Sequence, residues 1–181
     1  MLITPTPERL KHFTQEATAE AVCRLPYIQR RREKVNDYFL FEVIKRGLIL
    51  EKIIIDYIKS LCSMYNTELI VRNNDCKTAL YYDFAIKKND IIKYFDIAGR
   101  GFSGSFITEP KIKARQKCDY YVLAELIEWR EAKIYAVIKK EDLERFVDVK
   151  SIDYELDKVM KPSILYNFSK GEFVGKLSLF Y

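Results

Sequence analysis

Residues 79–100 read ALYYDFAIKKNDIIKYFDIAGR and contain two apolar runs separated by a short polar segment. Ala79–Ile86 and Ile91–Ile97 are rich in aromatic and β-branched residues, as β-strands commonly are. The intervening Lys87–Asp90 has the polar composition of a turn. We therefore expect a β-hairpin at this point of the chain.

The residues before the hairpin favour helices. We predict one helix over Pro7–Cys23 that ends before Pro26, and a second over Ile28–Lys45 that ends at Gly47. A third helix is expected from Leu48 to Tyr65, because apolar residues recur there every three or four positions.

Further strands are predicted on both sides of the hairpin. Glu68–Val71 precedes it, and Asp119–Leu126 and Ala132–Ile138 follow it. A short helix is expected over Lys140–Phe146. Helices followed by strands and then a helix indicate an α/β fold with a mixed sheet.

Length and composition narrow the class of protein. A chain of 181 residues is expected to form one compact unit, with an N-terminal helical arm over residues 1–47 and an α/β core over residues 48–181. Hydrophobic residues make up 49% and charged residues 31%, which excludes a disordered chain. The longest apolar run, Ile53–Ile55 with its neighbours, is too short to span a bilayer, so no membrane association is expected.

The cysteines and the single histidine give no sign of a metal cluster. No CxxC pair occurs among the four cysteines, and His12 lies alone near the N-terminus, so a zinc site is not expected. We predict reduced cysteines and a cytoplasmic location.

Two aspartates carry the chemistry that the sequence suggests. Asp83 lies inside the first predicted hairpin strand and Asp96 inside the second, where a charge is costly unless it binds something. If the strands pair through Lys87–Asp90, both carboxylates meet on one side of the hairpin. Two carboxylates with water form the hard-oxygen site that Mg²⁺ uses. The alternative is that both are ordinary residues on a solvated strand face.

This arrangement resembles the PD-(D/E)XK nuclease family, which has the restriction-endonuclease-like fold. In that family a helix with a Glu precedes a hairpin with an Asp, and the next strand holds Asp or Glu, one residue, then Lys. Glu51, Asp83 and Asp96 stand in that order here. The resemblance covers roughly Leu48–Phe146 and implies a mixed β-sheet flanked by helices, with the N-terminal helices as an extension. It further implies a Mg²⁺-dependent DNA endonuclease, often a homodimer, in which Asp83 and Asp96 hold the metal and Glu51 assists.

One residue departs from the family pattern. The family lysine would fall at position 98, where this chain has Ala98. Three interpretations follow: the chain binds without cutting, or a neighbouring cation such as Lys93, Arg100 or Lys111 replaces the lysine, or Ala98 is an inactivating replacement of it. Glu109-Pro110-Lys111 is a second ExK pattern, ranked lower because its proline would remove a ladder donor.

Two basic runs flank the hairpin and favour nucleic acid as the partner, since phosphate contacts need sets of Lys and Arg. The net charge of +5 understates them, because acidic residues gather after Glu141. Non-catalytic nucleic-acid binding on the same fold and RNA processing are the alternative functions. The residues predicted to bind nucleic acid are Arg30, Arg31, Arg32, Lys34, Arg100, Lys111, Lys113 and Arg115.

Overall fold

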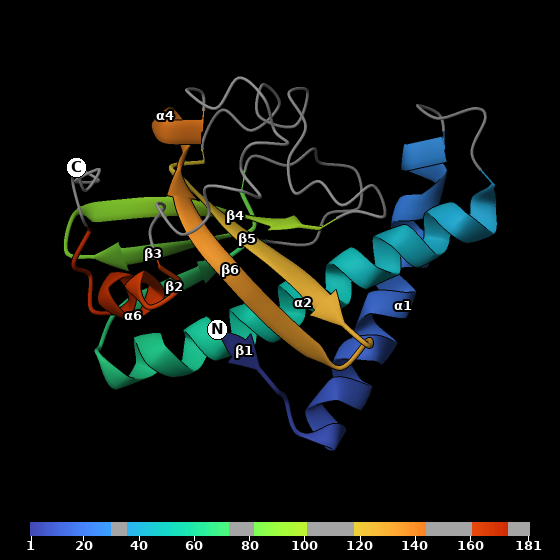
Figure 1. The fold of residues 1–181 in the computed structure, drawn as a ribbon, viewed down its shortest axis with the longest axis horizontal. Helices are drawn as coiled ribbons and strands as arrows, with labels where there is room; N and C mark the ends of the chain where they lie inside the picture. Colours follow the sequence, from blue (N-terminus) through green and yellow to red (C-terminus); the bar gives the residue numbers. More distant parts are fainter. Residues whose placement is uncertain (30–35, 73–81, 101–117, 144–160, 174–181) are drawn as a thin grey trace.

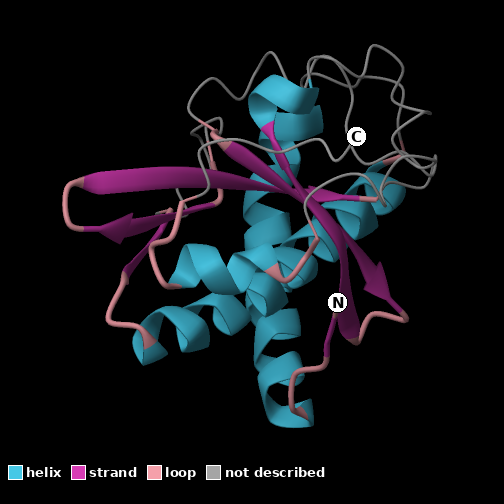
Figure 2. Ribbon diagram, turned by 60° about the vertical axis from the view of Figure 1, so that its left-hand side comes forward, coloured by secondary structure: helices cyan, strands magenta, loops and turns pink. Residues whose placement is uncertain are grey.

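A mixed β-sheet with two long helices along one face forms the described part of the protein in a computed structural model (Figures 1 and 2). The structure describes residues 1–29, 36–72, 82–100, 118–143 and 161–173. The helices are α1 (Pro7–Gln29), α2 (Asp37–Met64), α4 (Lys140–Leu143) and α6 (Ile164–Ser169). The strands are β1 (Leu2–Ile3), β2 (Glu68–Val71), β3 (Phe84–Lys88), β4 (Ile91–Gly99), β5 (Tyr120–Ile127) and β6 (Glu131–Lys139).

The strand order is β1-β6-β5-β4-β3-β2, which confirms the mixed α/β prediction. β3 and β4 form the predicted antiparallel hairpin, with Phe84 opposite Phe95. β4 and β5 are parallel, and all other neighbouring pairs are antiparallel. β1 was not predicted, because two residues carry no periodic signal; it pairs with the edge of β6. β2 forms the opposite edge of the sheet.

α2 is one continuous helix, so the predicted break at Gly47 is wrong. Asn36 caps its start by accepting a hydrogen bond from the Tyr38 backbone N–H at 2.8 Å. Gly47 costs a helix about 1 kcal/mol relative to alanine. Leu48 and Ile49 directly after it are buried, and burial of such side chains outweighs that cost. The boundary between residues 1–47 and 48–181 therefore falls inside α2.

α1 continues to Gln29, so the predicted end before Pro26 is also wrong. Ala17 and Ala21 are fully buried, and their small side chains allow α1 to approach α2 closely. An ion pair between Arg9 and Asp56 adds a polar contact between the two helices. α1 is thus packed into the same hydrophobic core as the sheet.

Aromatic rings on the helix-covered face of the sheet form the centre of the core. The Phe95 ring stacks on Phe84 at 4.8 Å and on Tyr120 at 5.2 Å between centroids. Phe168 of α6 closes the cluster at 5.4 Å from Phe95. The sequence did not predict α6, a helix of six residues that places the Phe168 ring in the core.

The cysteines differ from expectation at one position. Cys62 and Cys118 are free thiols and are buried. Cys23 is disulfide-bonded, so the prediction of reduced cysteines is wrong there. Among the described helices, none is both long enough and apolar enough to cross a membrane.

Replacing Phe95 with alanine tests the aromatic core. Because Phe95 is fully buried between three rings, Phe95→Ala should lower the free energy of unfolding by about 3–5 kcal/mol. Ile91→Ala, at a side chain of the same strand that is 54% exposed, is the control and should cost much less. Urea unfolding followed by circular dichroism measures both. Similar losses in the two variants would contradict this account of the core.

Candidate active site

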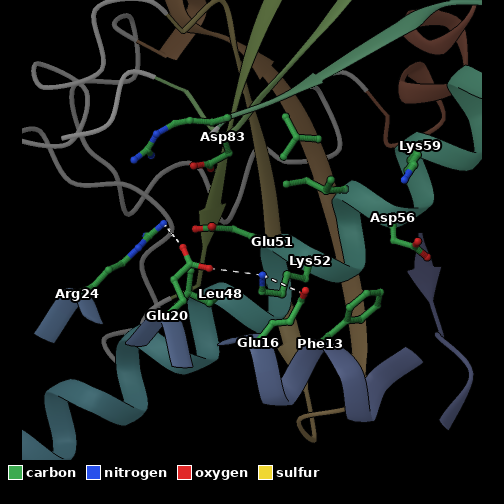
Figure 3. A pocket seen from close by; sticks show the side chains of 13 residues that line it. Phe13, Glu16, Glu20, Arg24, Leu48, Glu51, Lys52, Asp56, Lys59 and Asp83 are labelled. Carbon is green, nitrogen blue, oxygen red and sulfur yellow. Dashed lines mark hydrogen bonds and ion pairs between the residues drawn. The ribbon is translucent and has the colours of Figure 1, made fainter. Parts of the chain in front are cut away.

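A cavity of about 240 Å³ lies where α1 and α2 meet the end of β2 and the start of β3 (Figure 3). Phe13 and Leu48 make part of its lining apolar, and most of its lining residues are charged. The charged residues that line it are Glu16, Glu20, Arg24, Glu51, Lys52, Asp56, Lys59, Arg72 and Asp83. Two residues singled out from the sequence, Glu51 and Asp83, are among them.

Asp83 lies in a bend immediately before β3 and is held there by three hydrogen bonds. Its backbone N–H donates to the Phe95 carbonyl at 2.8 Å, and its carbonyl accepts from the Arg72 N–H at 3.3 Å. The carboxylate Oδ2 accepts from the Ile97 N–H at 2.7 Å. The side chain thus bonds to a backbone donor of β4 and still borders the cavity, with 7% of the residue exposed.

Glu51 reaches the cavity from the middle of α2. It follows Leu50, whose side chain packs toward the sheet, and each further helical residue turns by about 100°. That rotation brings Glu51 to the side of α2 that borders the cavity rather than the core. Figure 3 shows its carboxylate between those of Asp83 and Glu20.

α1 supplies one wall through a set of ion pairs. Glu20 binds Arg24 at 2.5 Å, and Lys52 of α2 lies 3.5 Å from Glu20 and 3.3 Å from Glu16. The Glu20 and Arg24 side chains are only 9% and 16% exposed, so water screens this pair weakly. The ammonium of Lys52 and the guanidinium of Arg24 are consequently balanced by carboxylates of the protein itself.

Asp96 is next to Asp83 but does not line the cavity. Both neighbours of Asp96 in the chain, Phe95 and Ile97, bond to Asp83. Asp96 itself is fully buried in β4. Burial raises the pKa of the Cys118 thiol, and the nearby Asp96 carboxylate raises it further, with a smaller contribution from Asp83. The hairpin therefore places the two aspartates together, with only Asp83 at the cavity.

Ala98 also lies away from the cavity. It is fully buried in β4, where its partner in the parallel strand β5 is Leu123. The position at which the family pattern places a lysine is thus inside the protein.

Two of the three cations proposed to replace that lysine, Lys93 and Arg100, are among the described residues, and both lie elsewhere. Lys93 pairs with Asp119 at 3.7 Å, and Arg100 pairs with Glu125 at 3.6 Å. Neither lines the cavity. The other predicted nucleic-acid contacts lie outside the described residues: Arg30, Arg31, Arg32, Lys34, Lys111, Lys113 and Arg115.

The donor set of the cavity fits a hard divalent cation that keeps water in its coordination shell. No cluster of three or more His, Cys, Asp or Glu residues suited to a metal occurs among the described residues. Mg²⁺ commonly binds through one or two carboxylates together with waters and substrate phosphates. Glu51 and Asp83, two carboxylates at the wall of one open cavity, meet that requirement.

Sequence reasoning missed the contribution of α1 and the cations of α2. Glu16, Glu20 and Arg24 recur every four residues, a spacing that places them on one side of a helix. That signal was present, but nothing in the sequence shows that this side faces Lys52 and Glu51.

Comparisons with protein-family models, with curated proteins and with solved structures each find no match.

Because the Asp83 carboxylate accepts a hydrogen bond from the Ile97 N–H, two substitutions of Asp83 should differ in their effect on stability. Asp83→Ala leaves a buried donor without its acceptor and should cost about 1–3 kcal/mol of unfolding free energy. Asp83→Asn keeps a side-chain oxygen and should cost clearly less. Denaturant unfolding of both variants is the measurement. A larger loss in Asp83→Asn than in Asp83→Ala would show that this bond is not what holds the bend.

Proposed function

We propose that the protein is a Mg²⁺-dependent DNA endonuclease of the PD-(D/E)XK type, with a restriction-endonuclease-like fold. The observation that carries the proposal is that Glu51 of α2 and Asp83 of the hairpin line one cavity. They come from distant parts of the sequence, in the order that the family resemblance implies. A cytoplasmic location and action as a homodimer belong to the same proposal and rest on that resemblance.

In this proposal Asp83 and Glu51 hold the metal. A bound Mg²⁺ would stabilise the charge of the phosphodiester transition state and lower the pKa of a coordinated water. The bend at Asp83 is fixed by its bonds to β4, so the carboxylate is oriented in advance. Asp96 is fully buried and does not line the cavity, so it would not be a ligand there.

Lys52 is the cation best placed to serve in place of the family lysine. It follows Glu51 in α2 and lines the same cavity, whereas Lys93 and Arg100 do not. Its contacts with Glu16 and Glu20 hold the ammonium at the cavity wall. A phosphate entering the cavity would compete with these carboxylates for Lys52.

The second candidate function is non-catalytic binding of nucleic acid on the same fold. The burial of Ala98 and the absence of a lysine there favour it. Binding without hydrolysis needs neither a metal nor Asp83, so a cleavage assay separates the two functions. RNA cleavage is separated in the same assay by the choice of substrate.

Cleavage of supercoiled plasmid, single-stranded DNA and RNA with and without Mg²⁺ tests the proposal. We expect Mg²⁺-dependent cleavage of DNA, and a loss of at least about 100-fold in rate for Glu51→Gln and Asp83→Asn, since each removes a charged oxygen ligand. Asp90→Asn in the exposed β3–β4 turn removes one carboxylate elsewhere and is the matched control. No cleavage of any substrate by either the wild type or Ala98→Lys, or equal rates in the wild type, Glu51→Gln, Asp83→Asn and Asp90→Asn, would refute the enzyme.

Introducing the family lysine tests whether position 98 is a functional site. Ala98→Lys places an ammonium in a fully buried position, which should destabilise the fold by about 2 kcal/mol or more unless the lysine finds an anionic partner there. Thermal unfolding measures this, with Ala98→Met as a control of similar length and no charge. A lysine variant that is as stable as wild type and cleaves DNA faster would instead support Ala98 as an inactivating replacement.

A further inference from the structure

A second cavity continues from the first along α2 and the edge strand β2. It has a volume of about 340 Å³ and is lined by Lys59, Cys62, Ser63, Thr67, Leu69 and Val71. Lys59 and Val71 line the first cavity as well. The two cavities therefore adjoin, and Lys59 stands where they meet.

The two cavities differ in charge. Among the described residues, five carboxylates and four cations line the first cavity, whereas Lys59 is the one charged residue that lines the second. Leu69 and Val71 make one of its walls apolar. A group that carries one negative charge and an otherwise uncharged body matches this second cavity better than a metal does.

Lys59 is also distinct from the other cations of α1 and α2 at the site. Lys52 and Arg24 are paired with carboxylates. In the part of the chain that the structure describes, no carboxylate pairs with the ammonium of Lys59, which is on an exposed residue. An incoming anion would therefore meet this charge without displacing a carboxylate of the protein.

The spacing along α2 suits a polymer. Lys59 follows Glu51 by eight residues, which is about 12 Å along a helix at 1.5 Å per residue. Successive phosphates of a nucleic-acid strand lie closer together than this, so a strand with one phosphate near Glu51 and Asp83 has another within reach of Lys59.

We propose that Lys59 binds a phosphate that flanks the reacting one, and that the second cavity receives the adjoining nucleotide of the same strand. The identity of the ligand as nucleic acid rests on the proposed function. The contact is to the backbone, so it favours no base sequence.

Binding measured in EDTA tests this without cleavage. The probes are a fluorescent single-stranded DNA and a duplex of the same sequence, titrated by anisotropy at several salt concentrations. For Lys59→Ala we expect several-fold weaker binding and a decrease of about 0.7 in the slope of log Kobs against log[salt] for the single strand, or about 0.9 for the duplex. Lys59→Arg should restore binding.

Lys11→Ala removes the same charge from an exposed position of α1 that lines neither cavity, and it is the control. Its slope should match wild type. Equal slopes and affinities for Lys59→Ala and Lys11→Ala would overturn the role of Lys59 and leave the nuclease proposal intact. If only Lys59→Ala loses affinity and the protein cleaves nothing, the result would support the role of Lys59 in binding nucleic acid and refute the nuclease proposal. No binding of either probe by the wild type would overturn the role of Lys59, whereas the cleavage assay with Mg²⁺ decides the nuclease proposal.

Discussion

The burial of one side of α2 against the sheet is the constraint on which the rest of the structure depends. Ile54 and Ile58 are fully buried on that side, which fixes the rotation of the helix about its axis. Once the rotation is fixed, the side of the helix on which each remaining residue lies is fixed as well. Glu51 and Lys59 are such residues, and both border a cavity. Hydrophobic packing thus determines on which side of α2 Glu51 and Lys59 lie.

Asp83 shows how the sheet itself contributes to the candidate site. An aspartate in the middle of a strand would alternate with its neighbours and lie on the face opposite Phe84. Here the backbone bends one residue before β3, and the carboxylate accepts the Ile97 N–H. The residue satisfies a donor of β4 and reaches the cavity at the same time. A structural role and a chemical role coincide in one side chain, so stability and activity of any Asp83 variant have to be measured separately.

The sequence predicted the α/β class, the hairpin and the strands from periodicity, because apolar alternation reports directly on which residues a sheet buries. It failed at Gly47 and Pro26, where local helix-breaking tendencies were overridden by packing of the flanking apolar residues. Glu51 and Asp83 were found as candidates, and the structure places both at one cavity. Asp96 and Ala98 were placed in the same site, yet both are fully buried. Strand periodicity gives the face of a residue but not whether other segments cover that face, so their burial could not be read from the sequence.

The charge of the first cavity is consistent with the metal that we propose. Among the described residues that line it, carboxylates outnumber cations by five to four, and Lys52 and Arg24 form ion pairs with Glu16 and Glu20. A phosphodiester near Glu51 and Asp83 would meet the negative charge of both carboxylates, and in a partly buried site this repulsion is screened less than in water. In our proposal these two residues would hold a divalent ion, which would supply a positive charge for the phosphate. Among the described residues no carboxylate lines the second cavity, so in our proposal attraction to the strand and dependence on the metal would belong to two adjoining but separate cavities.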